Sequence, residues 1–167
     1  DDELERELYE KAVEVLGKSG YRRYEISNFA RPGMEARHNV KYWTREPYIG
    51  LGAAAHSFYG GCRYGSPAGL KDYYKRVQEG PLAAREKTRL TKRDEMSEFM
   101  YLGMRMSKGV SQREFEEQFG KRLFDVFGES IRWLESLKLV ETAGDAVRLT
   151  PKGINVSNSV FSRFLLD

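Results

Sequence analysis

The amino-acid sequence predicts two parts of different fold class: an α/β region over residues 1–87 and a mainly helical, winged-helix-like domain over residues 88–167. Three observations support this division. An amphipathic helical pattern near the start leads directly into a strand of alternating polarity. From Thr88 onward, three helical patterns, a two-stranded hairpin and a last helix follow one another. The 167 residues are enough for one ordinary domain or two small ones, with a sizeable core.

In the first part, residues 2–18 are expected to form a helix, because Leu4, Leu8, Val15 and Leu16 recur at three- and four-residue spacing. Residues 21–29 then alternate between polar and apolar side chains, which is typical of a strand. A helix that leads directly into a strand is half of a β-α-β unit. This segment is therefore expected to belong to a parallel sheet or barrel.

The remainder of the first part predicts one further strand and one further helix. Residues 34–47 show no clean period and are expected to form an ordered loop or a short helical turn. Residues 48–56 are expected to form a short buried strand that leads into small residues. The glycine-rich residues 60–69 are expected to form an irregular surface segment. Residues 70–78 predict a short helix that ends at Gly80.

The second part begins with a capped helix. Thr91, followed three residues later by Asp94, is typical of an N-cap. Ser111 is expected to cap a short second helix, and residues 123–137 to form the third. Residues 139–150 predict a small hairpin, and a final helix follows it. This order of elements resembles a winged helix.

The charge of the chain argues against a nucleic-acid partner. The net charge is +3, from 28 basic and 25 acidic residues, which is too balanced for a polyanion-binding protein. The helix of a winged fold that would enter a DNA groove, about residues 121–138, carries acidic as well as basic residues. A structural role for this helix is favoured. A nucleic-acid-binding module remains as an alternative function of a different class.

Composition also excludes several kinds of site. The lone cysteine, Cys62, cannot form an intrachain disulfide, a four-cysteine zinc site or an iron–sulfur cluster. No apolar run reaches the roughly 20 residues of a membrane span. Because the chain starts at Asp1 with neither a methionine nor a leader, we expect a fragment of a longer, cytoplasmic protein.

The densest cluster of chemically unusual residues is a run that contains His38, Asn39, Tyr42 and Trp43. An imidazole is a good ligand for haem iron, and aromatic rings can lie against a macrocycle. The basic side chains that could pair with haem propionates are Arg37, Lys41 and Arg45. The alternative is a polar loop that packs through its aromatic side chains, with His38 bonded to backbone.

A second cluster, residues 50–57, is rich in glycine and alanine. Such residues let a backbone approach a ligand closely, but they equally suit a tightly packed strand end. The run lacks the Gly-x-Gly-x-x-Gly spacing of dinucleotide binders, since residue 55 is Ala. Cys62 stands beside Arg63, which could lower the pKa of the thiol and make it an alternative haem ligand.

Three motifs in a fixed order resemble one known family. They are Tyr24–Gly33 (YEISNFARPG), Arg37–Trp43 (RHNVKYW) and Tyr48–His56 (YIGLGAAAH). Their series is similar to that of the HemW-type radical S-adenosylmethionine proteins, which resemble the oxygen-independent coproporphyrinogen III oxidases. The resemblance covers essentially the whole chain, as the C-terminal portion of a longer protein.

This resemblance implies a fold and a set of cofactors. Residues 1–87 would be the last β/α elements of a partial radical S-adenosylmethionine barrel, and residues 88–167 the family's helical C-terminal domain. The family binds a [4Fe–4S] cluster, with S-adenosylmethionine on its open iron, through a Cys-x3-Cys-x2-Cys motif. That motif is absent here, so we expect the cluster's cysteines upstream and assign no catalytic or cluster-binding residue to this chain. A truncated barrel leaves strand edges unpaired, which makes a homodimer possible.

The resemblance also implies the site residues. The family's His-Asn-x-x-Tyr-Trp segment, associated with haem binding in the haem-chaperone branch, matches His38, Asn39, Tyr42 and Trp43. The oxidase branch carries different residues here. The chain is therefore expected to bind haem or porphyrin and pass haem to haem-accepting proteins, with oxidative decarboxylation of coproporphyrinogen as the alternative.

Two further assignments follow from the same resemblance. Gly52, Ala54 and Ala55 match a segment near the S-adenosylmethionine pocket of the oxidase branch, and we expect them to line its vicinity. His38 is expected to contact haem and is a candidate for the axial ligand of its iron. His56 and Cys62 are the competing ligands.

Overall fold

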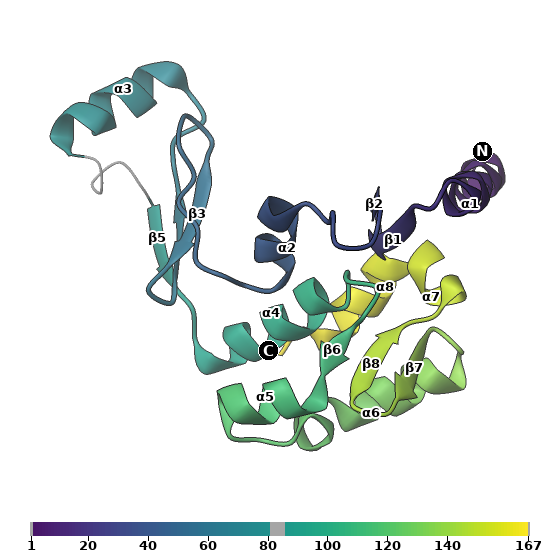
Figure 1. Ribbon diagram of the computed structural model, residues 1–167. Coiled ribbons are helices and arrows are strands. Elements are labelled where there is room, and N and C mark those ends of the chain that lie inside the picture. Colours follow the sequence, from purple (N-terminus) through teal and green to yellow (C-terminus); the bar gives the residue numbers. More distant parts are fainter. Residues whose placement is uncertain (1, 81–85, 167) are drawn as a thin grey trace.

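The computed structural model describes residues 2–80 and 86–166, and Figure 1 shows the arrangement of their helices and strands. The elements of the first part are α1 (Asp2–Lys18), β1 (Arg22–Glu25), β2 (Asn28–Ala30), α2 (Arg37–Trp43), β3 (His56–Tyr59), β4 (Cys62–Gly65), α3 (Leu70–Glu79) and β5 (Glu86–Arg89). Those of the second part are α4 (Lys92–Gly103), β6 (Val110–Ser111), α5 (Gln112–Phe119), α6 (Leu123–Ser136), β7 (Val140–Ala143), β8 (Ala146–Leu149), α7 (Pro151–Asn155), α8 (Ser157–Phe161) and the 3-10 turn η1 (Ser162–Phe164). The predicted mixture of helices and strands is confirmed.

The hydrophobic core lies in the second part. Helices α4, α5 and α6 pack against the antiparallel sheet β6-β8-β7 and the C-terminal helices (Figure 1). Eight residues of this core have no exposed surface, among them Met100, Phe115, Ile131, Leu134 and Phe164. Phe115 meets two further phenylalanine rings edge to face and a third at a tilt. Because these side chains come from several helices, the second part encloses a core of its own.

The predicted caps of the second part are confirmed. The Thr91 hydroxyl accepts from the Asp94 N–H at 3.2 Å, and the Asp94 carboxylate accepts from the Thr91 N–H at 2.7 Å. Ser111 caps α5 by accepting from the Glu114 N–H at 3.0 Å. The Ser111 hydroxyl donates to Asp145 in the turn between β7 and β8, and this bond lowers the pKa of the Asp145 carboxyl. These bonds attach the start of α5 to the hairpin.

The first of two small sheets differs from its prediction. Residues 21–29 do not form one strand of a parallel sheet: β1 and β2 are an antiparallel hairpin. The side chain of Glu25 explains the turn, because its buried carboxylate accepts from the Ser27 N–H at 3.0 Å and from the Asn28 amide at 2.5 Å. A single strand and a hairpin with a short turn can show the same alternating pattern. Here the hydrogen bonds of the Glu25 side chain favour the turn.

The second small sheet, β3-β4-β5, is also antiparallel. The segment expected to be irregular, residues 60–69, contains strand β4, and Gly60 and Gly61 form the β3–β4 turn with φ of 58° and 71°. The expected strand over residues 48–56 is wrong, since the sheet starts only at His56. Gly50 lies so close to the returning chain that a Cβ there would be 2.2 Å from the His56 carbonyl oxygen.

The helices of the first part are confirmed, and two of them carry exposed apolar side chains. On α1 these are Leu4, Leu8 and Val15, and on α3 they are Leu70, Tyr74 and Val77. Helix α3 stands away from the second part (Figure 1), whereas the sheet β3-β4-β5 reaches α4 through Arg63 of β4, which is bonded to Glu98. Helix α2 lies beside α4 (Figure 1). None of the helices in the described ranges is long and apolar enough to span a membrane.

Candidate functional site

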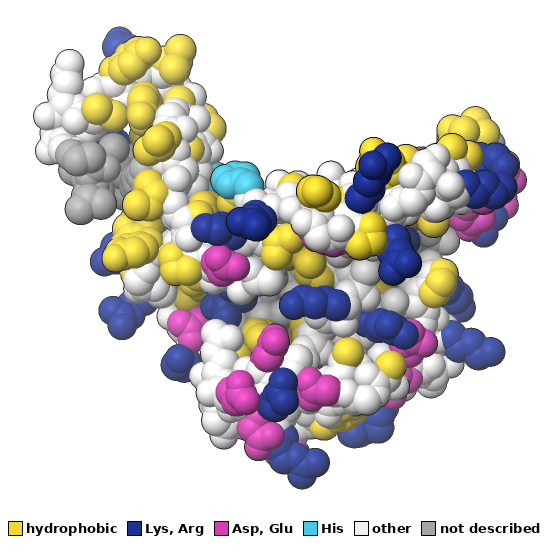
Figure 2. Space-filling view, viewed as in Figure 1, with side chains coloured by type: hydrophobic (Ala, Val, Ile, Leu, Met, Phe, Trp, Pro, Cys, Tyr) yellow, Lys and Arg dark blue, Asp and Glu magenta, His cyan; other side chains and the backbone are white. Residues whose placement is uncertain are grey.

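Helix α2 places the His-Asn-x-x-Tyr-Trp motif on two neighbouring faces. Residues four apart lie one above the other on a helix, so that His38 pairs with Tyr42 and Asn39 with Trp43. His38 is exposed, and the other three are half buried. Figure 2 shows a histidine at the concave surface between the β3–β5 sheet and α2, with Lys and Arg side chains beside it.

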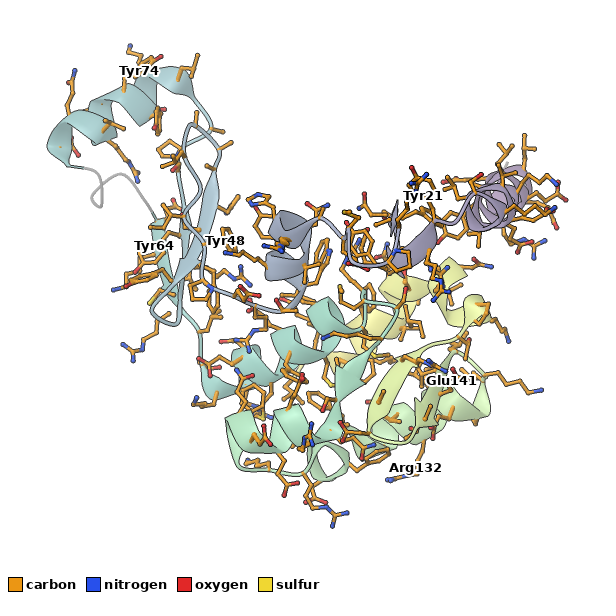
Figure 3. The ribbon with its side chains drawn as sticks, in the orientation of Figure 1. Tyr21, Tyr48, Tyr64, Tyr74, Arg132 and Glu141 are labelled. Carbon is orange, nitrogen blue, oxygen red and sulfur yellow. The ribbon has the colours of Figure 1, made fainter. Side chains whose placement is uncertain are left out.

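The phenol of Tyr42 holds the imidazole of His38. The Tyr42 hydroxyl oxygen lies 2.8 Å from His38 Nε2, and the two rings meet edge to face with centroids 5.0 Å apart. The Tyr42 ring in turn meets Tyr48 edge to face at 4.6 Å, and Figure 3 shows Tyr48 between α2 and β3. His38 is therefore bonded to a side chain of its own motif, at the end of an aromatic row.

The indole of Trp43 packs against the second part. The guanidinium of Arg105, which follows α4, lies 4.2 Å from the indole centroid, a cation–π distance. Arg105 also lies 3.6 Å from the fully buried carboxylate of Glu25. Trp43 borders a cavity of about 60 Å³, far below the several hundred Å³ of an ordinary ligand pocket. Arg105 thus covers one face of the indole, and that face is not available to a flat ligand.

A buried ion network fixes the segment that follows α2. Glu98 of α4 accepts from Arg63 Nε at 3.1 Å, from Arg63 Nη2 at 2.9 Å and from Arg45 Nε at 3.3 Å. Arg63 also donates to the Tyr48 hydroxyl at 3.1 Å. Burial lowers the pKa of Arg63, but its hydrogen bonds to Glu98 and the charge of that carboxylate outweigh burial and raise it overall.

This network changes the set of basic residues available for a haem propionate. The Arg45 side chain is only 6% exposed and lies against Glu98, so Arg45 cannot reach an anion at the surface. Arg37 is exposed, and Lys41 lies 4.0 Å from Glu46 with about half of its side chain exposed. The structure therefore leaves Arg37 and Lys41 for that role and removes Arg45.

Gly52, Ala54 and Ala55 lie in the tight loop before β3. Gly52 and Ala54 have positive φ of 109° and 57°. The Ala54 N–H donates to the Pro67 carbonyl, and the Ser66 N–H donates to the Ala55 carbonyl, each at 2.9 Å. At Gly52 the positive φ favours glycine, since a Cβ there would meet nothing within 4 Å. No described contact joins the three residues to α2.

The two competing axial ligands are unequal in access. His56 is exposed at the start of β3, where its ring lies across Gly65 of the paired strand. Cys62 is only 2% exposed, inside the sheet opposite Tyr59 and Arg89. A thiol in this position cannot reach a ligand at the surface, so that of the three residues predicted as candidate axial ligands only His38 and His56 are accessible.

In chemical terms, the site offers an exposed imidazole, aromatic rings and two exposed cations at the surface. Among residues 2–80 and 86–166, no group of three or more His, Cys, Asp or Glu side chains could hold a metal ion. The chain therefore does not fit an iron–sulfur cluster. Glu98 and Arg105, which fix α2 from the second part, were not predicted, because nothing in their local sequence indicates a contact some 50 residues away.

Comparison with known proteins identifies relatives along the chain. Residues 90–156 match the HemN C-terminal domain. The chain is 37% identical over 163 residues to heme chaperone HemW of Bacillus subtilis, covering 98% of this chain and 43% of that protein. It is 36% identical over 161 residues to heme chaperone HemW of Lactococcus lactis, covering 96% and 42%. The chain thus spans less than half the length of these relatives.

A solved structure shows the same fold. It is coproporphyrinogen III oxidase (HemN) from Escherichia coli, a radical SAM enzyme, with a TM-score of 0.72 and 22% identity. The superposition covers 93% of this chain and 39% of that chain.

Proposed function

This chain is a relative of the heme chaperone HemW proteins and carries a HemN C-terminal domain, and on this premise we propose that it is the haem-binding part of a radical S-adenosylmethionine haem chaperone. Haem is then the cargo, bound at the surface of α2 and passed to a haem-accepting protein. The observation that carries the proposal is the exposed imidazole of His38 within the aromatic motif of α2.

The residues of α2 have the chemistry that this cargo requires. The His38 imidazole supplies a nitrogen donor for iron. Arg37 and Lys41 lie on the same short helix and are free of buried ion pairs, so they can pair with propionates. Tyr42 and Trp43 supply apolar surface for the macrocycle, and Asn39 a polar group at its edge.

The test is haem titration of the full-length protein, followed through the Soret band. His38→Ala should shift the band and weaken binding, whereas Trp43→Ala should weaken binding with little change in ligation. His56→Ala is the matched control, since it removes the other exposed imidazole. An unchanged spectrum and affinity in His38→Ala would contradict the proposal. If only His56→Ala lost haem binding, His56 of β3 would be the axial ligand instead.

The oxidase alternative is not favoured. The relatives with 36–37% identity are named heme chaperones, and the likeness to the oxidase structure, at 22% identity, shows the fold alone. Product analysis with coproporphyrinogen, S-adenosylmethionine and a reductant would test it in the full-length protein. A nucleic-acid-binding role predicts a salt-dependent gel shift, and the nearly even charge of the chain predicts none.

We also propose a finer organisation for the parent protein. Residues 1–87 would close a radical S-adenosylmethionine barrel, whose [4Fe–4S] cluster is held by cysteines outside this chain, with Gly52, Ala54 and Ala55 near the S-adenosylmethionine. Residues 88–167 would form a winged-helix-like domain, which the order α4-β6-α5-α6-β7-β8 supports. We place the protein in the cytoplasm.

The exposed apolar face of α1 supports contact with further protein, either the rest of the barrel or a second copy of this chain. Sedimentation of this chain beside the full-length protein distinguishes the two. If this chain dimerises and the full-length protein does not, the dimer forms through a face that the rest of the barrel covers in the full-length protein. If both dimerise, the interface belongs to the full-length protein.

A further inference from the structure

The hydroxyl of Tyr42 is hydrogen-bonded to Nε2 of His38, the ring nitrogen that is proposed to bind iron. The hydroxyl lies 2.8 Å from Nε2, the outer ring nitrogen of the exposed imidazole. When the phenol donates this hydrogen bond, it uses the same lone pair that an iron ion would take. Haem ligation through Nε2 therefore requires that the Tyr42 hydrogen bond is broken first.

The phenol is held in this position by its surroundings. The Tyr42 ring meets the Tyr48 ring edge to face at 4.6 Å and 88°. The Tyr48 hydroxyl accepts from Arg63 Nη1 at 3.1 Å, and Arg63 is fixed by two hydrogen bonds to Glu98. A ring packed in this way does not turn freely, so the hydroxyl remains beside His38 when no ligand is present.

We propose that Tyr42 is a positioning residue that competes with haem iron for His38 Nε2 and thereby keeps haem affinity low enough for transfer. This inference rests on the proposed haem-binding function and deepens it. On loading, iron replaces the phenol at Nε2. On release, the phenol takes back the nitrogen, which leaves no free donor for the departing iron.

The expected size of the effect follows from one hydrogen bond. A neutral hydrogen bond contributes about 0.5–1.5 kcal/mol, which corresponds to a change of about two- to tenfold in affinity. Tyr42→Phe keeps the ring, its contact with Tyr48 and its apolar surface, and removes only the hydroxyl. It should therefore tighten haem binding by about two- to tenfold and slow haem release, with the Soret band of the loaded protein unchanged.

The experiment is a double-mutant cycle in the full-length protein, with haem affinity and the rate of haem release to excess haem-free globin as readouts. The variants are Tyr42→Phe, His38→Ala and the two together. Tyr59→Phe is the matched control, because Tyr59 is an exposed tyrosine of β3 for which no contact with α2 is described. The proposal expects Tyr42→Phe to tighten binding in the parent, to have no effect in His38→Ala, and to differ from Tyr59→Phe.

The outcomes separate this inference from the proposed function. If His38→Ala weakens binding while Tyr42→Phe leaves it unchanged or weakens it, the inference is overturned and the haem site stands. If Tyr42→Phe tightens binding equally with and without His38, its effect does not pass through the imidazole, and the inference is again overturned. If His38→Ala changes nothing, both the inference and the proposed site fail.

Discussion

Replacing Glu98 by Gln should destabilise this chain strongly, because the carboxylate is the only anion in the described ion network that joins α4 to the segment after α2. The Glu98 side chain is 8% exposed and the Arg45 side chain 6%. Arg45 also has a positive φ of 58°, an unfavourable conformation for a side chain of its size, which the ion pair helps to maintain. Gln keeps the shape of the residue and removes its charge.

The magnitude can be estimated from the geometry. At about 3 Å and an effective dielectric constant of about 20, one ion pair is worth roughly 5 kcal/mol before the cost of dehydration. Most of this gain is offset by burial of the charges, but removing the Glu98 charge leaves the buried guanidinium of Arg45 without compensation, at a cost of about 3–5 kcal/mol. Arg63, whose side chain is 28% exposed, can be solvated instead. For a chain of this length, a loss of about 3–5 kcal/mol lowers the unfolding temperature by about 6–20 °C.

The assay is thermal and urea unfolding followed by circular dichroism, and Glu141→Gln is the matched control. The Glu141 carboxylate accepts from Arg148 Nε at 2.7 Å, but both side chains are 44–49% exposed. A pair in this environment contributes about 0–1 kcal/mol, although its distance is shorter than any in the Glu98 network. Equal losses in the two variants would refute the reasoning that burial, rather than distance, decides the effect.

Three further changes test other parts of the structure. Arg105→Leu removes the cation over Trp43 and should change the indole fluorescence and lower stability by more than 1 kcal/mol, as measured by urea unfolding. Asp145→Asn tests pH dependence: the hydroxyl of Ser111 lowers the pKa of the Asp145 carboxyl in the folded state, so its stabilisation is present above the unfolded pKa and is lost as pH falls below about 4. The Asn variant should show a flatter loss of stability between pH 6 and pH 2, and an unchanged slope would contradict this. Gly153→Ala should cost at least about 1–3 kcal/mol in thermal unfolding, because its Cβ would lie 1.8 Å from a backbone carbonyl oxygen.

The second part of the chain could be predicted well from its sequence. Its helices bury long apolar stripes, and its caps, Thr91 and Ser111, act on N–H groups three residues away. Both signals are local, so that they are visible in a short window of sequence. There were two exceptions. The terminal helix is broken into α7, α8 and a 3-10 turn, and the short strand β6 was not predicted.

The first part was predicted less well, because its strands are short and their pairing is decided at a distance. Residues 21–29 show the alternation of one strand, but the buried carboxylate of Glu25 turns the segment into a hairpin. Strand β4 carries turn-like residues and pairs on both sides, with β3 and with β5. A short stretch of sequence does not show which distant strand it will pair with. Strand β5 was not predicted at all.

For the second part, the sequence was enough to predict the order of the main helices and of the hairpin. For α2, helical spacing alone groups His38 with Tyr42 and Asn39 with Trp43. The tertiary structure decided which of these side chains are available for a ligand. It directed Arg45 to the buried carboxylate of Glu98, covered one face of Trp43 with Arg105, and enclosed Cys62 in a sheet. The physical reason is that burial and charge pairing depend on residues that are distant in the chain and adjacent only after folding.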